Sequence, residues 1–279
     1  MIKNTHIDEL KTFQQRIMCL NDDSFNANNV CVVTGAASGI GRVMAIAAAA
    51  NDLMTLGIDM DSEGGRETQH MARELGGQMI FIETDYGRKD RLQHAVSEAG
   101  KMGTIKFLAN MATATEDGID PDGCWPEQAQ RRTILSRLSS CLSGLAMAQI
   151  KKNGDGAGVI GNLAWHPTGS MIPTSILSHE ATLNTDEAGP TPDRKYAEIK
   201  KFTINVVHGK GTPLPVERMP DRAGFAEKTT KNVYPHFFDI ANMFIFGFSR
   251  YAGCLVRGDL FFSKETKQMK RPFSLGLGN

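Results

Sequence analysis

The chain has 279 residues, of which 41% are apolar, and its 31 basic side chains balance 31 acidic ones. This length and composition are sufficient for one full α/β core, so that no second domain is needed. The zero formal net charge, without a basic run interleaved with aromatic residues, argues against a nucleic acid or an anionic membrane surface as a partner.

The same sequence predicts a soluble protein of the cytoplasm. No segment approaches the roughly 20 apolar residues that a transmembrane helix needs. The N-terminus carries charged side chains where a secretory signal would be apolar. The five cysteines are odd in number and widely spaced, without a Cys-x-x-Cys pair or paired histidines nearby, which predicts reduced thiols and no metal site.

Residues 1–29 precede the first predicted strand and are interpreted as an N-terminal helical extension. Apolar side chains recur there at three- and four-residue spacing, which is typical of an amphipathic helix. They are Ile7, Leu10, Phe13, Ile17 and Leu20. Two functions are open for this helix, because it can cover the bottom of the sheet of its own chain or dock on a partner chain.

Residues 30–279 are expected to form a single domain in which strands and helices alternate, as in a doubly wound parallel sheet with helices on both faces. The fold class is therefore α/β, Rossmann-like, with seven strands and an extra N-terminal helix. The strands are predicted at about Val30–Thr34, Leu53–Ile58, Met79–Glu83, Ile105–Ala109, Val159–Leu163, Phe202–Val207 and Leu255–Phe262. A long helix from about Glu127 to Lys151 has one broad apolar face, which suits either core packing or contact with a second subunit.

A glycine-rich loop between the first strand and the alanine-rich helix that follows it predicts a dinucleotide phosphate site. Glycines permit a sharp turn and a close backbone approach to a pyrophosphate, and the N-terminus of the helix offers unpaired N–H groups to an anion. The loop runs from Thr34 to Gly41, with the spacing Gly-x-x-x-Gly-x-Gly. The candidate phosphate-binding residues are Gly35, Ser38, Gly39, Ile40 and Gly41.

The second predicted strand ends at Asp59, eighteen residues beyond Gly41. A carboxylate at this place can accept hydrogen bonds from both hydroxyls of the adenosine ribose, and it repels a 2′-phosphate. No Arg or Lys lies immediately beside Asp59 to reverse this preference, so the predicted cofactor is NAD rather than NADP.

The glycine spacing and the order of elements resemble the short-chain dehydrogenase/reductase family. The resemblance implies that Asp85 touches the adenine, that Asn110 and Ala112 follow the fourth strand beside the nicotinamide ribose, and that Thr212 bonds the nicotinamide carboxamide. Two residues depart from the family's Asn-Asn-Ala-Gly at the fourth strand. They are Met111 and Thr113, which add bulk where the ribose would approach.

The catalytic residues of the family are a Ser after the fifth strand, a Tyr and a Lys four residues apart on one helix, and an Asn on the preceding helix. Ala164 and Trp165 stand where two serines are usual, and Arg137 stands about where the Asn belongs. Tyr-x-x-x-Lys does occur, at Tyr196 and Lys200, but the sixth predicted strand begins two residues later. The catalytic helix would have to cross the sheet before that strand, so Tyr196 is expected at the wrong edge.

We therefore expect no catalytic residues of the usual kind in this chain. The segments 158–162 and 246–251 resemble dehydrogenase pairs of anaerobic aromatic degradation, in which a catalytic subunit assembles with a related subunit that lacks the catalytic residues. This resemblance implies a hetero-oligomer with a homologous catalytic dehydrogenase. Two alternatives stay open: an active NAD-dependent alcohol dehydrogenase that uses Tyr196 and Lys200 behind an insertion, and an NADH-sensing regulator.

Overall fold

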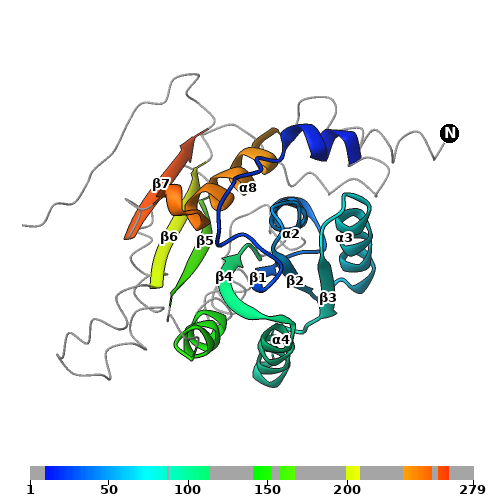
Figure 1. The fold of residues 1–279 in the computed structure, drawn as a ribbon, viewed down its shortest axis with the longest axis vertical. Coiled ribbons are helices and arrows are strands. Elements are labelled where there is room, and N and C mark those ends of the chain that lie inside the picture. Colours follow the sequence, from blue (N-terminus) through cyan, green and yellow to red (C-terminus); the bar gives the residue numbers. More distant parts are fainter. Residues whose placement is uncertain are drawn as a thin grey trace, which may run out of the picture.

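The structure is a computed structural model, and it describes residues 10–86, 88–112, 141–152, 157–166, 199–207, 235–252 and 257–263. Its strands pair in parallel throughout, in the order β3-β2-β1-β4-β5-β6-β7 (Figure 1). The strands are β1 (Asn29–Thr34), β2 (Met54–Asp59), β3 (Met79–Glu83), β4 (Thr104–Asn110), β5 (Gly158–His166), β6 (Ile199–Val207) and β7 (Arg257–Ser263). The predicted parallel α/β sheet is confirmed, and side chains are described for β1 to β4 and for the first half of β5.

Helices cover both faces of the sheet, as the alternation of elements predicts. The named helices are α2 (Gly39–Ala50), α3 (Ser62–Glu74), α4 (Lys89–Met102), α8 (Pro235–Phe248) and the short 3₁₀ helix η2 (Arg250–Ala252). Residues 141–150 are also helical and belong to the long helix predicted from Glu127, whose first part lies outside the described residues.

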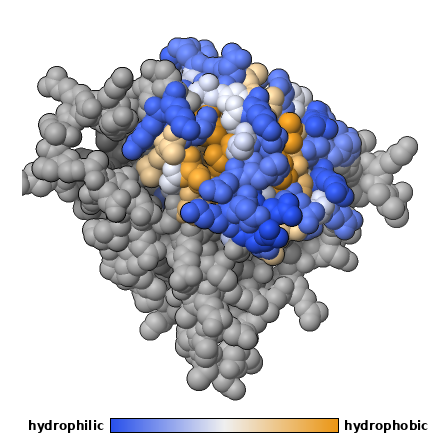
Figure 2. All heavy atoms as spheres, turned by 90° about the horizontal axis from the view of Figure 1, so that it is seen from below, coloured by the Kyte–Doolittle hydropathy of each residue, from blue (hydrophilic) through white to orange (hydrophobic). Residues whose placement is uncertain are grey.

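Alternate residues of β1 point into two separate apolar cores. Cys31 and Val33 belong to the core beneath α2 and α8, whereas Val30 and Val32 belong to the core beneath α4 and the helical residues 141–150. Both sets are fully or almost fully buried, so β1 is apolar on both faces, as a central parallel strand must be. On the side of α4, apolar side chains show between hydrophilic ones (Figure 2).

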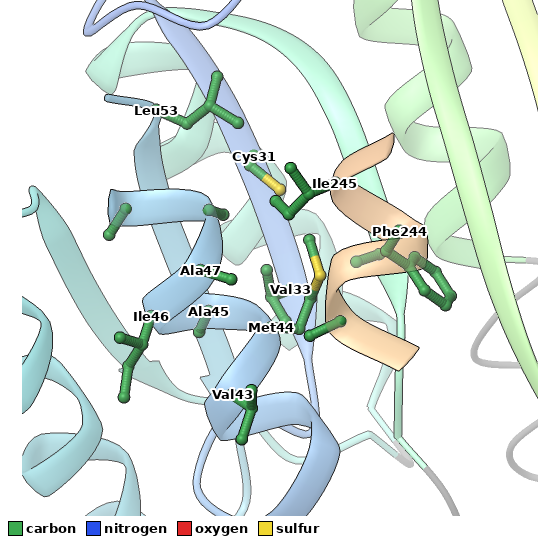
Figure 3. Close-up of a cluster of buried hydrophobic side chains, with 14 of the residues drawn as sticks. Cys31, Val33, Val43, Met44, Ala45, Ile46, Ala47, Leu53, Phe244 and Ile245 are labelled. Carbon is green, nitrogen blue, oxygen red and sulfur yellow. The ribbon is translucent and has the colours of Figure 1, made fainter. Parts of the chain in front are cut away.

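The alanine-rich composition of α2 explains how closely this helix packs. Nearly every residue of α2 is buried, including the run from Ala47 to Ala49. Short side chains let α2 lie against the sheet and against α8 at once, and Met44 fills the space between α2, β1 and Ile245 of α8 (Figure 3). The position of α2 fixes the glycine loop, because that loop joins β1 to α2.

Residues 10–25 lie on their own chain, over α8 and the end of α2. A helical segment covers residues 10–16, and its Phe13 is 1% exposed and meets Phe238 of α8 edge to face at 5.0 Å between ring centres. The guanidinium of Arg16 lies 4.9 Å from the centre of the same Phe238 ring. Phe25 packs edge to face on Phe107 of β4, so the segment reaches the sheet itself.

Side-chain amides fasten this segment where it has no regular structure. Asn242 of α8 accepts from the backbone N–H of Met18 and donates to the carbonyl of Arg16, both at 2.9 Å. Asn51, at the end of α2, accepts from Leu20 N–H at 2.8 Å and donates to the carbonyl of Met18 at 2.9 Å. These bonds satisfy backbone groups that an irregular segment would otherwise leave unpaired.

Three element boundaries differ from the prediction in ways that matter for function. α2 begins at Gly39, inside the loop predicted from Thr34 to Gly41, so the last two glycines of that loop are already helical. β5 continues to His166 rather than ending at Leu163, and β6 begins at Ile199 rather than Phe202. The prediction missed the start of β6 because Lys200 and Lys201 are charged, and charged residues are rare in the apolar runs by which parallel strands are recognised.

Replacing Phe13 with alanine is expected to lower the free energy of unfolding by about 3–5 kcal/mol, because a large buried ring is lost and a cavity remains. Chemical denaturation measures this change. The matched control is Phe246→Ala on α8, whose side chain is 39% exposed and whose loss should cost clearly less. Equal costs for the two variants would contradict the packing of residues 10–16 on α8.

Asp22 makes the stability of this segment depend on pH. Burial raises the pKa of Asp22, but hydrogen bonds from the Ser24 hydroxyl and from the Arg250 and Ser24 N–H groups outweigh it, so the pKa lies below its usual value. The stabilisation is therefore present above the unfolded pKa of about 3.9 and is lost as the pH falls through the folded pKa.

We predict that Asp22→Asn lowers the free energy of unfolding at pH 7, and that the difference from the wild type shrinks as the pH falls below about 4. Denaturant titrations across this pH range measure the difference. Asp23→Asn is the control, because the Asp23 carboxylate is 88% exposed in its ion pair with Arg250 and should contribute little. A difference for Asp22→Asn that is independent of pH would contradict the account.

Candidate nucleotide site

The carboxyl ends of β1 and β4 lie side by side at the point where the strand order reverses, which is where ligands bind in open α/β sheets. The hydroxyl of Thr34, at the end of β1, joins the two strands by accepting hydrogen bonds from the N–H groups of Met111 and Ala112, both at 2.9 Å. The predicted residues Gly35, Asn110 and Ala112 are thus brought together at this crevice.

Two positions of the loop require glycine because neighbouring backbone atoms approach them too closely for a side chain. Gly35 has a φ of 72°, and a Cβ there would lie 3.0 Å from the Cα of Ala112. A Cβ on Gly41 would collide with the carbonyl of Gly35 itself. The first turn of α2 therefore packs directly on the start of the loop, and any larger residue at Gly41 forces the two apart.

The first three amides of the loop are donated to the neighbouring strand and to the residues that follow β3. Gly35 N–H donates to the hydroxyl of Tyr86 at 3.0 Å. Ala36 N–H donates to the Ile58 carbonyl at 3.3 Å, and Ala37 N–H donates to the Asp59 carboxylate at 3.1 Å. These bonds turn one side of the loop toward β2 and β3.

The next amides belong to the N-terminus of α2 and suit an anion. The first intrahelical bond runs from Arg42 N–H to the Ser38 carbonyl at 3.0 Å, so helix geometry gives no intrahelical acceptor to the N–H groups of Gly39, Ile40 and Gly41. Ser38 is exposed, its side chain makes no capping bond, and the first turn of α2 has no acidic residue. The arrangement fits a phosphate bound by these amides.

Arg42 was not predicted from the sequence to be a site residue, yet its side chain binds the backbone of the glycine loop. The residue is 7% exposed, and its guanidinium donates to the Ala37 carbonyl at 3.1 and 2.7 Å and to the Gly64 carbonyl at 3.3 Å. Its ion pair with Glu67, at 2.8 Å, balances the buried charge. The position of Arg42 directly after the glycine motif could have indicated a role in the loop. The sequence separation from Gly64 and Glu67 could not have indicated that Arg42 contacts them.

Both oxygens of the Asp59 carboxylate accept hydrogen bonds from backbone amides. One carboxylate oxygen accepts from Ala37 N–H, and the other accepts from Asp61 N–H at 3.1 Å. Each oxygen keeps a further lone pair, which a ribose hydroxyl can use. Asp85 lies at the same sheet edge, because the pairing of β2 with β3 continues from Glu83 to a bond between Thr84 N–H and the Asp59 carbonyl at 2.7 Å.

A buried polar cluster lies farther along the same edge. The Asn110 side chain is 4% exposed, and its amide donates to Asn162 of β5 at 2.8 Å and to Ser143 at 3.3 Å. Among the described residues, the Oδ1 atom of Asn110 has no hydrogen-bond partner, so an acceptor is left at the end of β4. Met111 does not add bulk to the crevice as expected, because its side chain is 3% exposed and belongs to the core beneath α2 and α8.

The positions that correspond to the family's catalytic residues lie partly in β5 and β6 and partly outside the described residues. Ala164 and Trp165 continue β5, where they pair with Asn205 and Val206 of β6. Lys200 lies in β6, paired with Val159 near the start of β5. The remaining residues named from the sequence lie outside the described residues: Thr113, Arg137, Tyr196 and Thr212.

The described residues contain no group of three or more His, Cys, Asp or Glu side chains that could hold a metal ion. No helix among them is both long and apolar enough to cross a membrane.

The part of the chain that contains this geometry is similar to known proteins. The family described as "short chain dehydrogenase" matches residues 29–152, which include the glycine loop, Asp59 and Asn110. An uncharacterized oxidoreductase of Thermotoga maritima is 31% identical over 132 residues, which are 46% of this chain and 50% of that protein. Epidermal retinol dehydrogenase 2 of Homo sapiens is 32% identical over 88 residues, 31% of this chain and 28% of that protein. The chain spans about half the length of the first curated relatives it matches.

Solved structures agree in fold over most of the chain. A hydroxysteroid dehydrogenase from Escherichia coli has a TM-score of 0.62 at 20% identity, over 88% of this chain and 100% of that one. A 7α-hydroxysteroid dehydrogenase complexed with NADH and 7-oxo glycochenodeoxycholic acid has a TM-score of 0.61 at 21% identity, over 87% of this chain and 96% of that one. At these identities the likeness shows the fold. The family match to "short chain dehydrogenase" covers residues 29–152, and the likeness in fold extends over most of the chain.

Proposed function

We propose that this chain is a short-chain dehydrogenase-type subunit that keeps the nucleotide half of the fold and lacks the proton-transfer half. It acts as the non-catalytic partner of a homologous NAD-dependent dehydrogenase, which oxidises a secondary alcohol of the 3-hydroxyacyl-CoA type to a ketone. The observation that carries the proposal is the position of Lys200 in β6.

Lys200 lies at the amino edge of the sheet, opposite the glycine loop. β6 runs from Ile199 to Val207, and seven residues separate Lys200 from the carboxyl end of the strand. At about 3.3 Å per residue this span is roughly 23 Å, which is far longer than a lysine side chain. A lysine that lowers the pKa of a catalytic tyrosine must instead lie on a helix beside the nicotinamide, at the carboxyl edge.

The replacement of two serines by Ala164 and Trp165 supports the same proposal. The family uses a hydroxyl at this place to polarise the substrate oxygen, and neither residue carries one. No single change therefore restores catalysis, because the hydroxyl and the Tyr–Lys pair both depart from the family pattern.

The nucleotide half supports NAD as the ligand. The α2 amides, the oriented Asp59 and the crevice between β1 and β4 lie at one edge of the sheet, and the carboxylate disfavours the 2′-phosphate of NADP. Bound NAD would be held at its pyrophosphate by α2 and at its adenosine ribose by Asp59.

The proposed partner and substrate rest on sequence resemblance. The segment 158–162 forms the first half of β5, and the segment 246–251 lies at the end of α8, where Phe246 and Tyr251 are exposed. Both segments resemble the enzyme of anaerobic toluene breakdown that oxidises 2-(hydroxy(phenyl)methyl)succinyl-CoA, of which this chain would be the non-catalytic subunit. That CoA thioester is the first substrate to assay.

The proposal predicts no turnover when the purified chain alone is mixed with NAD⁺ and the CoA thioester, as followed by NADH absorbance. Turnover should appear when a homologous catalytic chain is added, and Lys200→Met should leave its kcat unchanged. Turnover by this chain alone that Lys200→Met abolishes would overturn the proposal in favour of an active enzyme. NADH binding without turnover, together with a partner whose affinity depends on NADH, would indicate a regulator instead.

Gly41→Ala is expected to abolish saturable NADH binding, because the new methyl group forces α2 away from the Gly35 carbonyl. It should also lower the free energy of unfolding by about 1–3 kcal/mol. Titration by nucleotide fluorescence measures the binding.

The matched control is Gly100→Ala in α4, where a Cβ would meet only the flexible end of Gln149 at 3.5 Å. This variant should bind NADH as the wild type does and gain about 0.5–1 kcal/mol of stability. Unchanged NADH binding in Gly41→Ala would contradict a phosphate site at this loop.

A further inference from the structure

The Tyr86 hydroxyl connects three separate parts of the nucleotide site. Tyr86 follows β3, and its oxygen accepts a hydrogen bond from Gly35 N–H at 3.0 Å. The same hydroxyl donates to the Ile58 carbonyl at 2.8 Å, near the end of β2. One side chain therefore joins the start of the glycine loop to the adjacent strand.

Tyr86 is well suited to this double role because its phenol stays neutral. Burial raises the pKa of Tyr86, and the nearby Asp59 carboxylate raises it further. A neutral phenol is a donor and an acceptor at once, whereas a phenolate could not donate to Ile58. Within the described parts of the chain, Gly35 N–H donates to no acceptor other than the Tyr86 hydroxyl.

The direction of Gly35 decides which way the rest of the loop faces. Gly35 lies in the left-handed region, and its carbonyl lies where Gly41 of α2 packs. With Gly35, Ala36 and Ala37 N–H all directed toward β2 and Tyr86, the amides of the first turn of α2 face the crevice instead. Loss of the bond from Gly35 N–H to Tyr86 would remove the first of these three hydrogen bonds.

We propose that Tyr86 is a positioning residue for nucleotide binding, whose hydroxyl holds the glycine loop in the conformation that presents the N-terminus of α2 to a phosphate. The link to binding rests on the function proposed above. The positioning itself is a property of the chain and can be tested without a nucleotide.

The test compares Tyr86→Phe, which keeps the ring and removes only the hydroxyl, with Tyr251→Phe. The Tyr251 hydroxyl also donates to a backbone carbonyl, that of Asn21 at 2.8 Å, but its side chain is 52% exposed and lies at the other end of the chain. Amide hydrogen exchange by NMR is read at Gly35 and, as a reference, at Val32 in the middle of β1. NADH affinity is then titrated for all three proteins.

In Tyr86→Phe we expect Gly35 to exchange at least tenfold faster while Val32 is unchanged, and NADH to bind about tenfold more weakly, as expected for one unpaired buried group. Tyr251→Phe should change neither. Unchanged exchange at Gly35 would overturn the proposal. If the wild type does not bind NADH, the nucleotide part of the proposed function fails, and the exchange at Gly35 alone decides whether Tyr86 positions the loop.

A measurement on the wild type covers the case in which Tyr86→Phe does not fold. The Tyr86 hydroxyl proton, which is donated to the Ile58 carbonyl, should exchange slowly enough to be observed, with a nuclear Overhauser contact to the Gly35 amide proton that the same oxygen accepts. A Tyr86 ring that instead flips freely, with no such contact, would contradict the proposal.

Discussion

The site depends on one close approach, that of the first turn of α2 to the backbone of Gly35. No side chain can be inserted there, because a Cβ on Gly41 would overlap the Gly35 carbonyl. Hydrogen bonds around this contact hold the loop in place. Arg42 donates to the loop carbonyl of Ala37, and the Thr34 hydroxyl links the end of β1 to the residues after β4. The loop amides donate to β2 and to Tyr86. The N-terminal end of α2 is thus held by contacts within the chain, and such preorganisation would lower the entropic cost of the proposed phosphate binding.

The segment 10–25 supports the same helix from its other end. Asn51 at the end of α2 binds the backbone of Met18 and Leu20, and Asn242 of α8 binds the backbone beside them. Because α2 lies between this segment and the glycine loop, loosening the segment should weaken the packing of α2 as well. This placement matches a cover for the chain's own helices, which was one of the two functions that the sequence left open.

The sequence was informative where burial and backbone geometry leave few choices. The apolar run of β1 and the glycine spacing predicted the strand, the loop and the helix, since few other arrangements bury those residues. The bonds from Arg42 to Gly64 and from Gly35 to Tyr86 could not be predicted, because each joins groups that are distant in sequence. The bond from Tyr86 spans 51 residues to Gly35. The start of β6 was missed for a different reason, since Lys200 and Lys201 resemble a solvent-exposed face rather than a strand.

The proposed function depends on Lys200 belonging to a strand and not to a catalytic helix. Backbone ¹³Cα and ¹³Cβ chemical shifts of Ile199, Lys200 and Lys201 in the isotope-labelled full chain can distinguish the two, because strand and helix displace these shifts in opposite directions. We expect strand-like shifts at all three residues, with and without NADH. Helical shifts at Lys200 would contradict the proposed function, because the Tyr-x-x-x-Lys sequence would then share one helical face as in an active dehydrogenase.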